Sequence, residues 1–219
     1  MLKVNCPSCG AEITFQSSIT VSCVCPYCRS LVVRHDTNVE AIGTMAELPQ
    51  DVSPFQLGSA GIYRNTHFSL IGRLKIGWED GCWNEWFMLT DEGKKGWLAE
   101  AQGFLAVSFE KEEHNLPATA PMLSQYLTLQ DKQFCVGDVK QAECIGSEGE
   151  LPFAAPKGRK TTSADLISSD GGFACIEYND EGPPRFYVGE YTEFNMLKFT
   201  NLREVPGWDL KQMLGKTAQ

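Results

Sequence analysis

The 219-residue sequence lacks an apolar run of the ~18 residues needed to cross a bilayer. Its first residues, Met1 to Cys6, also lack the apolar segment that a secretory signal requires. We therefore expect a cytoplasmic protein without a transmembrane segment. Peripheral association with a membrane surface stays open.

Histidine is scarce, and the usual catalytic motifs are missing. His35, His67 and His114 are dispersed and match no metal-ligand spacing. The sequence has no glycine-rich phosphate loop, no nucleophile elbow and no Walker-type lysine. These absences exclude the common sequence signatures of nucleotide-binding enzymes and serine hydrolases.

Basic residues are fewer than acidic residues in this chain. The chain has 19 Lys and Arg against 28 Asp and Glu, and its formal net charge is −9 at pH 7. Binding to nucleic acid depends on basic side chains that displace counterions from the phosphates. The composition therefore argues against a nucleic-acid-binding protein, although zinc ribbons are frequent in transcription machinery.

The chain has nine cysteines, and four of them form two Cys-Pro-x-Cys hooks separated by fifteen residues. This spacing is typical of a structural zinc ribbon, in which four thiolates close the coordination sphere of one Zn²⁺. The predicted ligands are Cys6, Cys9, Cys25 and Cys28. A redox dithiol or a set of buried free thiols is the alternative. Gly10 after the first hook suits a left-handed turn, whereas Arg29 in the same place after the second hook is less favourable.

Cys23 is ambiguous because strand alternation places it on the same face as Cys25. It could replace Cys25 as a ligand, or it could be a simple core thiol. We keep Cys25, because the tighter hook that it forms mirrors the first one.

Short segments of alternating or β-branched residues, separated by turn signals, predict a mostly β protein. After the zinc ribbon we expect a two-lobed antiparallel domain resembling a β barrel or sandwich. The chain would divide into a ribbon (1–34), a linker (35–54), a β domain (55–205) with lobes at about 55–114 and 134–205, and a tail (206–219). Within the linker, Val39 to Leu48 could form a short helix capped by Asn38. Residues 196–202 are predicted as a final strand, and 152–163, with its basic residues, as a mobile loop.

Four of the five tryptophans fall within twenty residues: Trp78, Trp83, Trp86 and Trp97. Such a cluster can be ordinary cross-strand core packing. It can also form an aromatic surface that binds a peptide, a lipid headgroup or a partner protein. We carry the second interpretation forward as the candidate binding surface.

Four glutamates adjacent to aromatic residues are the candidates for acid or base chemistry, namely Glu85, Glu177, Glu100 and Glu190. Desolvation by a neighbouring aromatic can raise a carboxyl pKa, as a general acid requires. No histidine or nucleophile motif accompanies them, and structural or solvent-facing roles are the alternative.

Several of these segments resemble a bacterial domain of unknown function, DUF4178. The resemblance lies in residues 71–74, 83–89 and 96–98, and in the later segments 176–178 and 186–191. The preceding cysteine hooks are similar to those of many members, so the resemblance spans roughly residues 1–205. It implies no reaction, but it implies an accessory role near polyamine metabolism or a membrane-stress system.

The sequence thus predicts a non-catalytic binding or scaffolding protein with a structural Zn²⁺ and a protein partner. The alternative is an enzyme that uses carboxylates in a cleft between the lobes. A nucleic-acid-binding zinc ribbon is the third hypothesis.

Overall fold

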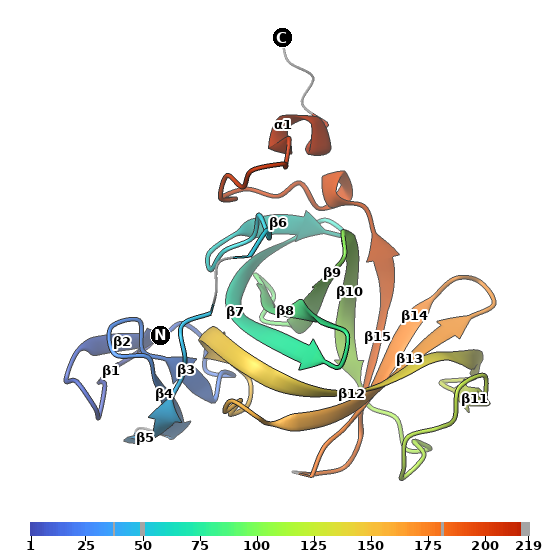
Figure 1. Ribbon diagram of the computed structural model, residues 1–219, viewed down its shortest axis with the longest axis horizontal. Coiled ribbons are helices and arrows are strands. Elements are labelled where there is room, and N and C mark those ends of the chain that lie inside the picture. Colours follow the sequence, from blue (N-terminus) through green and yellow to red (C-terminus); the bar gives the residue numbers. More distant parts are fainter. Residues whose placement is uncertain (37, 49–50, 181, 216–219) are drawn as a thin grey trace.

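The computed structural model describes residues 1–36, 38–48, 51–180 and 182–215, and these residues are almost entirely β (Figure 1). The predicted mostly β fold class is confirmed. The strands are β1 (Leu2–Asn5), β2 (Glu12–Phe15), β3 (Ser22–Val24), β4 (Ser30–His35), β5 (Asn38–Thr44), β6 (Ala60–Tyr63), β7 (Thr66–Trp78), β8 (Gly81–Thr90), β9 (Lys95–Ala101), β10 (Phe104–Lys111), β11 (Tyr126–Leu129), β12 (Lys132–Leu151), β13 (Lys160–Ser168), β14 (Phe173–Tyr178) and β15 (Arg185–Thr192).

Within the described part of the chain, eight antiparallel strands close into a ring in the order β7-β8-β9-β10-β15-β14-β13-β12. Strand β12 closes the ring because it is 20 residues long. Its first part pairs with β13, and its second part pairs with β7. The segments predicted as two lobes therefore meet in one continuous sheet, joined at β10–β15 and at β12–β7.

The N-terminal module is attached to this ring through β3. Strands β1 and β2 form a separate hairpin, whereas β3, β4 and β5 extend the large sheet. Ser22 and Cys23 of β3 pair with Leu151 and Glu150 at the end of β12 (Figure 1). The module is therefore continuous with the closed sheet.

The predicted linker contains a strand and not the short helix considered for residues 39–48. Residues 38–44 form β5, which pairs along β4. Alternation of Val39 and Ala41 with polar neighbours favours a strand, and Gly43 weakens a helix in this position. The N-terminal sheet thus extends beyond residue 34. Pro49, which marked the end of the linker, lies outside the described residues.

Apolar side chains pack on both surfaces of the ring. Inside it, Ile76, Phe87, Trp97, Cys144 and Tyr187 meet from strands that are not all neighbours. On the outside, the strands β7 to β10 are covered by Phe55 and by the segment after β15, and β12 to β15 carry a further cluster. The sheet is therefore buried on both faces over much of its area.

The predicted strand at 196–202 is wrong. Residues Phe194–Leu197 form the 3₁₀ helix η1, and Thr200 makes only an isolated bridge with Ala60. Lys198, which follows η1, has a left-handed backbone with a φ of 47°, and this conformation interrupts an extended strand. A short helix α1 (Leu210–Met213) follows in the predicted tail, whose last residues, 216–219, lie outside the described residues.

Candidate metal centre and interior acidic site

Each cysteine hook ends in a residue with left-handed backbone conformation. Gly10 has a φ of 75° and Arg29 a φ of 63°. The amide of Gly10 donates to the carbonyl of Cys6 at 2.8 Å, and the amide of Arg29 donates to the carbonyl of Cys25 at 2.9 Å. These matching turns direct the two hooks toward each other.

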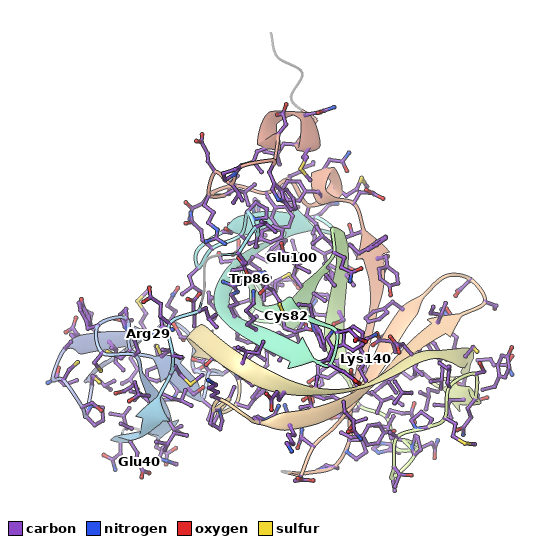
Figure 2. All side chains as sticks on the ribbon, viewed as in Figure 1. Arg29, Glu40, Cys82, Trp86, Glu100 and Lys140 are labelled. Carbon is purple, nitrogen blue, oxygen red and sulfur yellow. The ribbon has the colours of Figure 1, made fainter. Side chains whose placement is uncertain are left out.

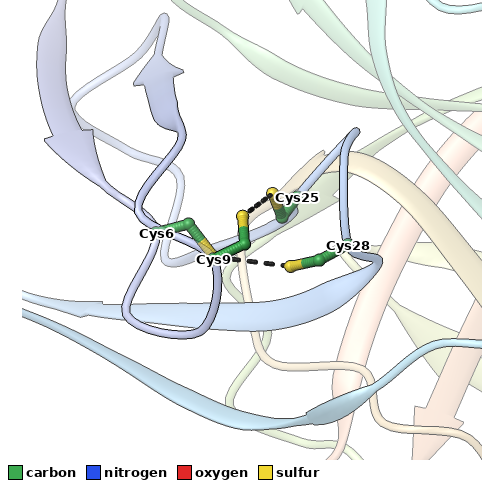
Figure 3. A group of neighbouring side chains, drawn as sticks. All are labelled: Cys6, Cys9, Cys25 and Cys28. Carbon is green, nitrogen blue, oxygen red and sulfur yellow. Dashed lines mark hydrogen bonds between the residues drawn. The ribbon is translucent and has the colours of Figure 1, made fainter.

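The four predicted thiol ligands converge. Their sulfur atoms all lie within 4.8 Å of one another. Cys6 Sγ is 3.6 Å from Cys28 Sγ, and Cys9 Sγ is 3.8 Å from Cys25 Sγ (Figure 3). A tetrahedron with metal–sulfur bonds of ~2.3 Å has edges of ~3.8 Å, so the sulfur positions fit a tetrahedral metal ion.

One of these thiols is already stabilised in its ionised form by its neighbour Ser30. The Ser30 hydroxyl lies 3.3 Å from Cys28 Sγ. Hydrogen bonds from the side chain and the backbone of Ser30 lower the pKa of Cys28 to about 6. Because a metal binds the thiolate, this contact favours metal binding near neutral pH.

Cys23 does not belong to the sulfur cluster. It is buried, and its thiol donates to the backbone carbonyl of Val24 at 3.6 Å. Burial, together with the nearby charge of Glu150, raises its pKa to about 12. The structure therefore places Cys25 in the cluster and leaves Cys23 as a core thiol.

The expected aromatic binding surface is wrong for two of its four tryptophans. Trp86 and Trp97 are only 1% and 9% exposed, because they pack on opposite faces of the sheet. Trp78 and Trp83 are partly buried against the interior cluster. Cross-strand packing explains this cluster, and no continuous exposed tryptophan surface results.

Two of the four candidate glutamates have structural partners. Glu100 is 8% exposed and accepts hydrogen bonds from Asn84 at 2.9 Å and from the Trp86 indole at 3.1 Å (Figure 2). Glu190 forms an ion pair with the exposed Arg64 at 2.9 Å. These contacts give both carboxylates structural roles, and they lie apart from the interior region that Glu85 faces.

A buried ionic network next to Glu100 was not predicted from the sequence. Arg73 and Lys75, whose side chains are 5% and 8% exposed, both donate to the carboxylate of Asp51. Arg203 approaches the other oxygen of the same carboxylate at 2.6 Å. Two cations within the apolar run of β7 were the signal that could have revealed it, since buried cations require a partner.

Glu85 and Glu177, in contrast, face the same interior region of the ring. Glu85 lies on β8 and Glu177 on β14, which are separated in the ring by β9, β10 and β15. Burial raises the pKa of Glu85 to about 7, and the charges of Glu177 and Asp165 add to this effect. Glu85 accepts a hydrogen bond from the Trp83 indole at 2.7 Å. Its environment therefore moves the titration of this carboxyl close to neutral pH.

Asp165 and Cys175 complete this interior site, and the sequence did not single them out. They lie directly opposite each other on β13 and β14, and their side chains hydrogen-bond. Burial raises the pKa of Cys175 well above its usual value. The group therefore stays a thiol and lacks the character of a nucleophile. Across the site, Glu177 pairs with Arg159 at 3.3 Å.

Replacing Glu85 with glutamine is expected to stabilise the protein by about 2 kcal/mol at pH 8 and to have little effect at pH 4. The glutamine keeps an oxygen for the Trp83 indole but has no charge to bury. Because the folded-state pKa of Glu85 lies above its unfolded value, wild-type stability should fall as the pH rises from about 4.5 to about 7. Urea unfolding at several pH values measures this, and equal slopes for wild type and Glu85→Gln would contradict it.

These features define an all-β protein with a four-cysteine centre and an acidic site inside a closed sheet. A family model described as a domain of unknown function (DUF4178) matches residues 56–194, more than half of the chain. The chain belongs to the DUF4178 family. The matched segment begins after the cysteine centre and contains every strand of the closed ring. Comparisons with curated proteins and with solved structures found no match.

The matched residues, 56–194, agree with the predicted resemblance over the β domain. The cysteine module lies outside the matched segment. None of the helices in the described part of the chain has the length and apolar character needed to span a membrane.

Proposed function

We propose that the chain is a non-catalytic binding or scaffolding protein in which the four thiolates hold one structural Zn²⁺. The observation that carries the proposal is the spacing of the four sulfurs, which closes a tetrahedron. A tetrahedral set of four sulfurs suits Zn²⁺ or iron, and four protein ligands leave no position for a substrate. The metal would contribute folding energy and not chemistry.

The attachment of the module supports a scaffolding role. Pairing of β3 with β12, and the hydrogen bonds from Gln16 and Thr20 to Glu150, hold the module in one orientation on the closed sheet. Tyr27, between the cysteines of the second hook, is 72% exposed. A zinc ion would thus present a rigid edge, including Tyr27, to a protein partner in the cytoplasm. Its context would be a membrane-stress or polyamine-related system.

Affinity capture with the full chain tests this proposal. We expect a specific partner that is retained by the wild type and by Cys23→Ser but lost with Cys25→Ser, since only the last change removes a ligand. If the wild-type chain retains no specific protein, the scaffolding proposal fails. Metal analysis of the same preparations should give about one zinc per chain, and iron in its place would contradict the zinc assignment.

A second candidate function is catalysis by the interior site. The observation in its favour is that two carboxyl groups, Glu85 with its raised pKa and the ion-paired Glu177, face the same region inside the ring. Paired carboxyl groups in different environments are the usual arrangement for general acid and base catalysis. A screen with chromogenic ester and glycoside substrates would compare wild type with Glu85→Gln. Turnover that survives this change would contradict a role for Glu85 as the acid.

A further inference from the structure

A pocket of about 160 Å³ opens where β9, β10 and β15 meet the loop that follows β12. By volume it can hold a small ligand of on the order of ten non-hydrogen atoms. Trp97, Phe153 and Tyr187 form its walls, and each is less than a tenth exposed. Such walls are fixed by packing, so the pocket has a defined shape before a ligand enters.

The charged side chains of the pocket are two cations and one carboxylate, namely Lys95, Arg185 and Glu110. Among the described residues, neither Lys95 nor Arg185 has a carboxylate oxygen within 4.0 Å. Lys75 and Arg73 elsewhere in the molecule are both paired with Asp51. The pocket lining therefore carries one more positive than negative charge, and two carboxylates, Glu110 and Glu177, lie near enough to Arg185 to interact with it electrostatically.

The position of the Arg185 guanidinium is fixed by its neighbours. It lies 5.3 Å from the centre of the Phe153 ring, and its charge acts on the nearby Tyr187 hydroxyl. Burial raises the pKa of Tyr187, so its hydroxyl stays protonated. The Tyr187 hydroxyl can therefore donate a hydrogen bond to a ligand in the pocket.

The surroundings of the pocket are also basic. The Arg159 guanidinium lies 4.7 Å from the Phe153 ring. With Lys157, Lys160 and Asp180, Arg159 lines an adjacent hollow, and Arg159 pairs with Glu177 at 3.3 Å. Lys157 and Lys160 therefore leave this hollow with more positive than negative charge on a chain whose net charge is −9, which would raise the local concentration of anions.

We propose that this pocket binds a small anionic molecule through a phosphate or carboxylate group, which Arg185 and Lys95 hold and to which the Tyr187 hydroxyl donates. The planar guanidinium suits the paired oxygens of either group. The inference rests on the proposed binding function and names the ligand class of one of its sites.

Titration calorimetry on the full zinc-loaded chain tests the inference. The probes are inorganic phosphate, phenyl phosphate and benzoate, with benzylamine as a cation of similar size. We expect saturable binding of at least one anion and none of benzylamine. Arg185→Gln and Lys95→Gln should each weaken binding about 10- to 100-fold, as expected for the loss of a charged hydrogen bond. Binding of the phosphates alone would assign a phosphate ligand, and binding of benzoate alone a carboxylate.

Lys157→Gln is the matched control, because it removes the same charge from the exposed adjacent hollow. It should change the affinity by no more than about twofold. An equal loss in Lys157→Gln, binding of benzylamine, or no saturable binding of any anion at millimolar concentration would overturn the inference. Lys95 is exposed, so its variant tests the pocket even if Arg185→Gln fails to fold. A protein partner that is retained by the wild type in the absence of anion binding would leave the proposed function intact.

Discussion

Replacing Cys25 with serine is expected to abolish metal binding and to unfold the N-terminal module. Cys25 is fully buried, and its sulfur is one of the four that lie within 4.8 Å of one another. Binding of a structural Zn²⁺ is worth about 10–16 kcal/mol in small zinc peptides, far more than a module of this size gains from its apolar core. Metal analysis should show loss of the ion, and hydrogen exchange should show loss of amide protection in β1 to β4.

The matched control is Cys23→Ser on the same strand. This residue is also buried but lies outside the sulfur cluster, so the variant should keep its metal and its protected amides. Strands β8 and β9, which pair with neither β3 nor β12, should stay protected in both variants. If Cys25→Ser retains a full complement of metal, the four-sulfur assignment is wrong. If its β8 and β9 also lose protection, the module and the ring fold as one unit.

Replacing Asp51 with asparagine is expected to destabilise the protein by about 3–5 kcal/mol. The change removes the carboxylate that the buried cations Arg73 and Lys75 share with Arg203, and Arg73 keeps only the longer contact with Glu148 at 3.7 Å. Removing one member of a buried ionic network costs this much because the remaining charges cannot reach water. Urea unfolding at pH 7 measures the effect.

Asp170→Asn provides the matched control. Asp170 pairs with Lys132 at 2.8 Å, but both side chains are well exposed, so its loss should cost less than about 1 kcal/mol. If Asp51→Asn and Asp170→Asn lose similar free energies of unfolding, the charges around Asp51 are not buried as a network.

The pH dependence of the Asp51 variant gives an independent check. Burial alone would raise the pKa of Asp51, but the hydrogen bond from Lys75 and the charge of Arg73 outweigh burial and lower the pKa to about 2. The contribution of Asp51 is therefore present above the unfolded pKa of about 4 and is lost as the pH falls toward 2. The difference in stability between wild type and Asp51→Asn should shrink over this range.

The metal centre was predictable from sequence because its geometry is local. Two residues between the cysteines of each hook, and the left-handed turns at Gly10 and Arg29, direct each pair of sulfurs. Only the closeness of the two hooks depends on the longer chain. The β fold class was equally accessible, since alternation and turn residues act over a few positions.

The partners in the ionic network around Asp51 could not be predicted from the sequence. Asp51 lies in a segment that reads as a linker, and its partners Arg73 and Arg203 are 22 and 152 positions away in the chain. No local pattern links these residues. The tryptophans show the same limit, because alternation predicts which of them share a face but not that both faces of the sheet are covered.

By itself, the sequence determined that the chain is an acidic β protein with two cysteine hooks spaced as in a metal site, because periodicity, hook spacing and charge are properties of short segments and of composition. Only the tertiary structure decided which glutamates meet and where cations are left unpaired. Glu85 and Glu177 face the same interior region because β12 closes the ring by pairing with both β13 and β7. The pocket at Arg185 forms where β9, β10 and β15 meet the loop after β12. These arrangements depend on pairing between strands far apart in the chain, for which a single sequence carries no local signal.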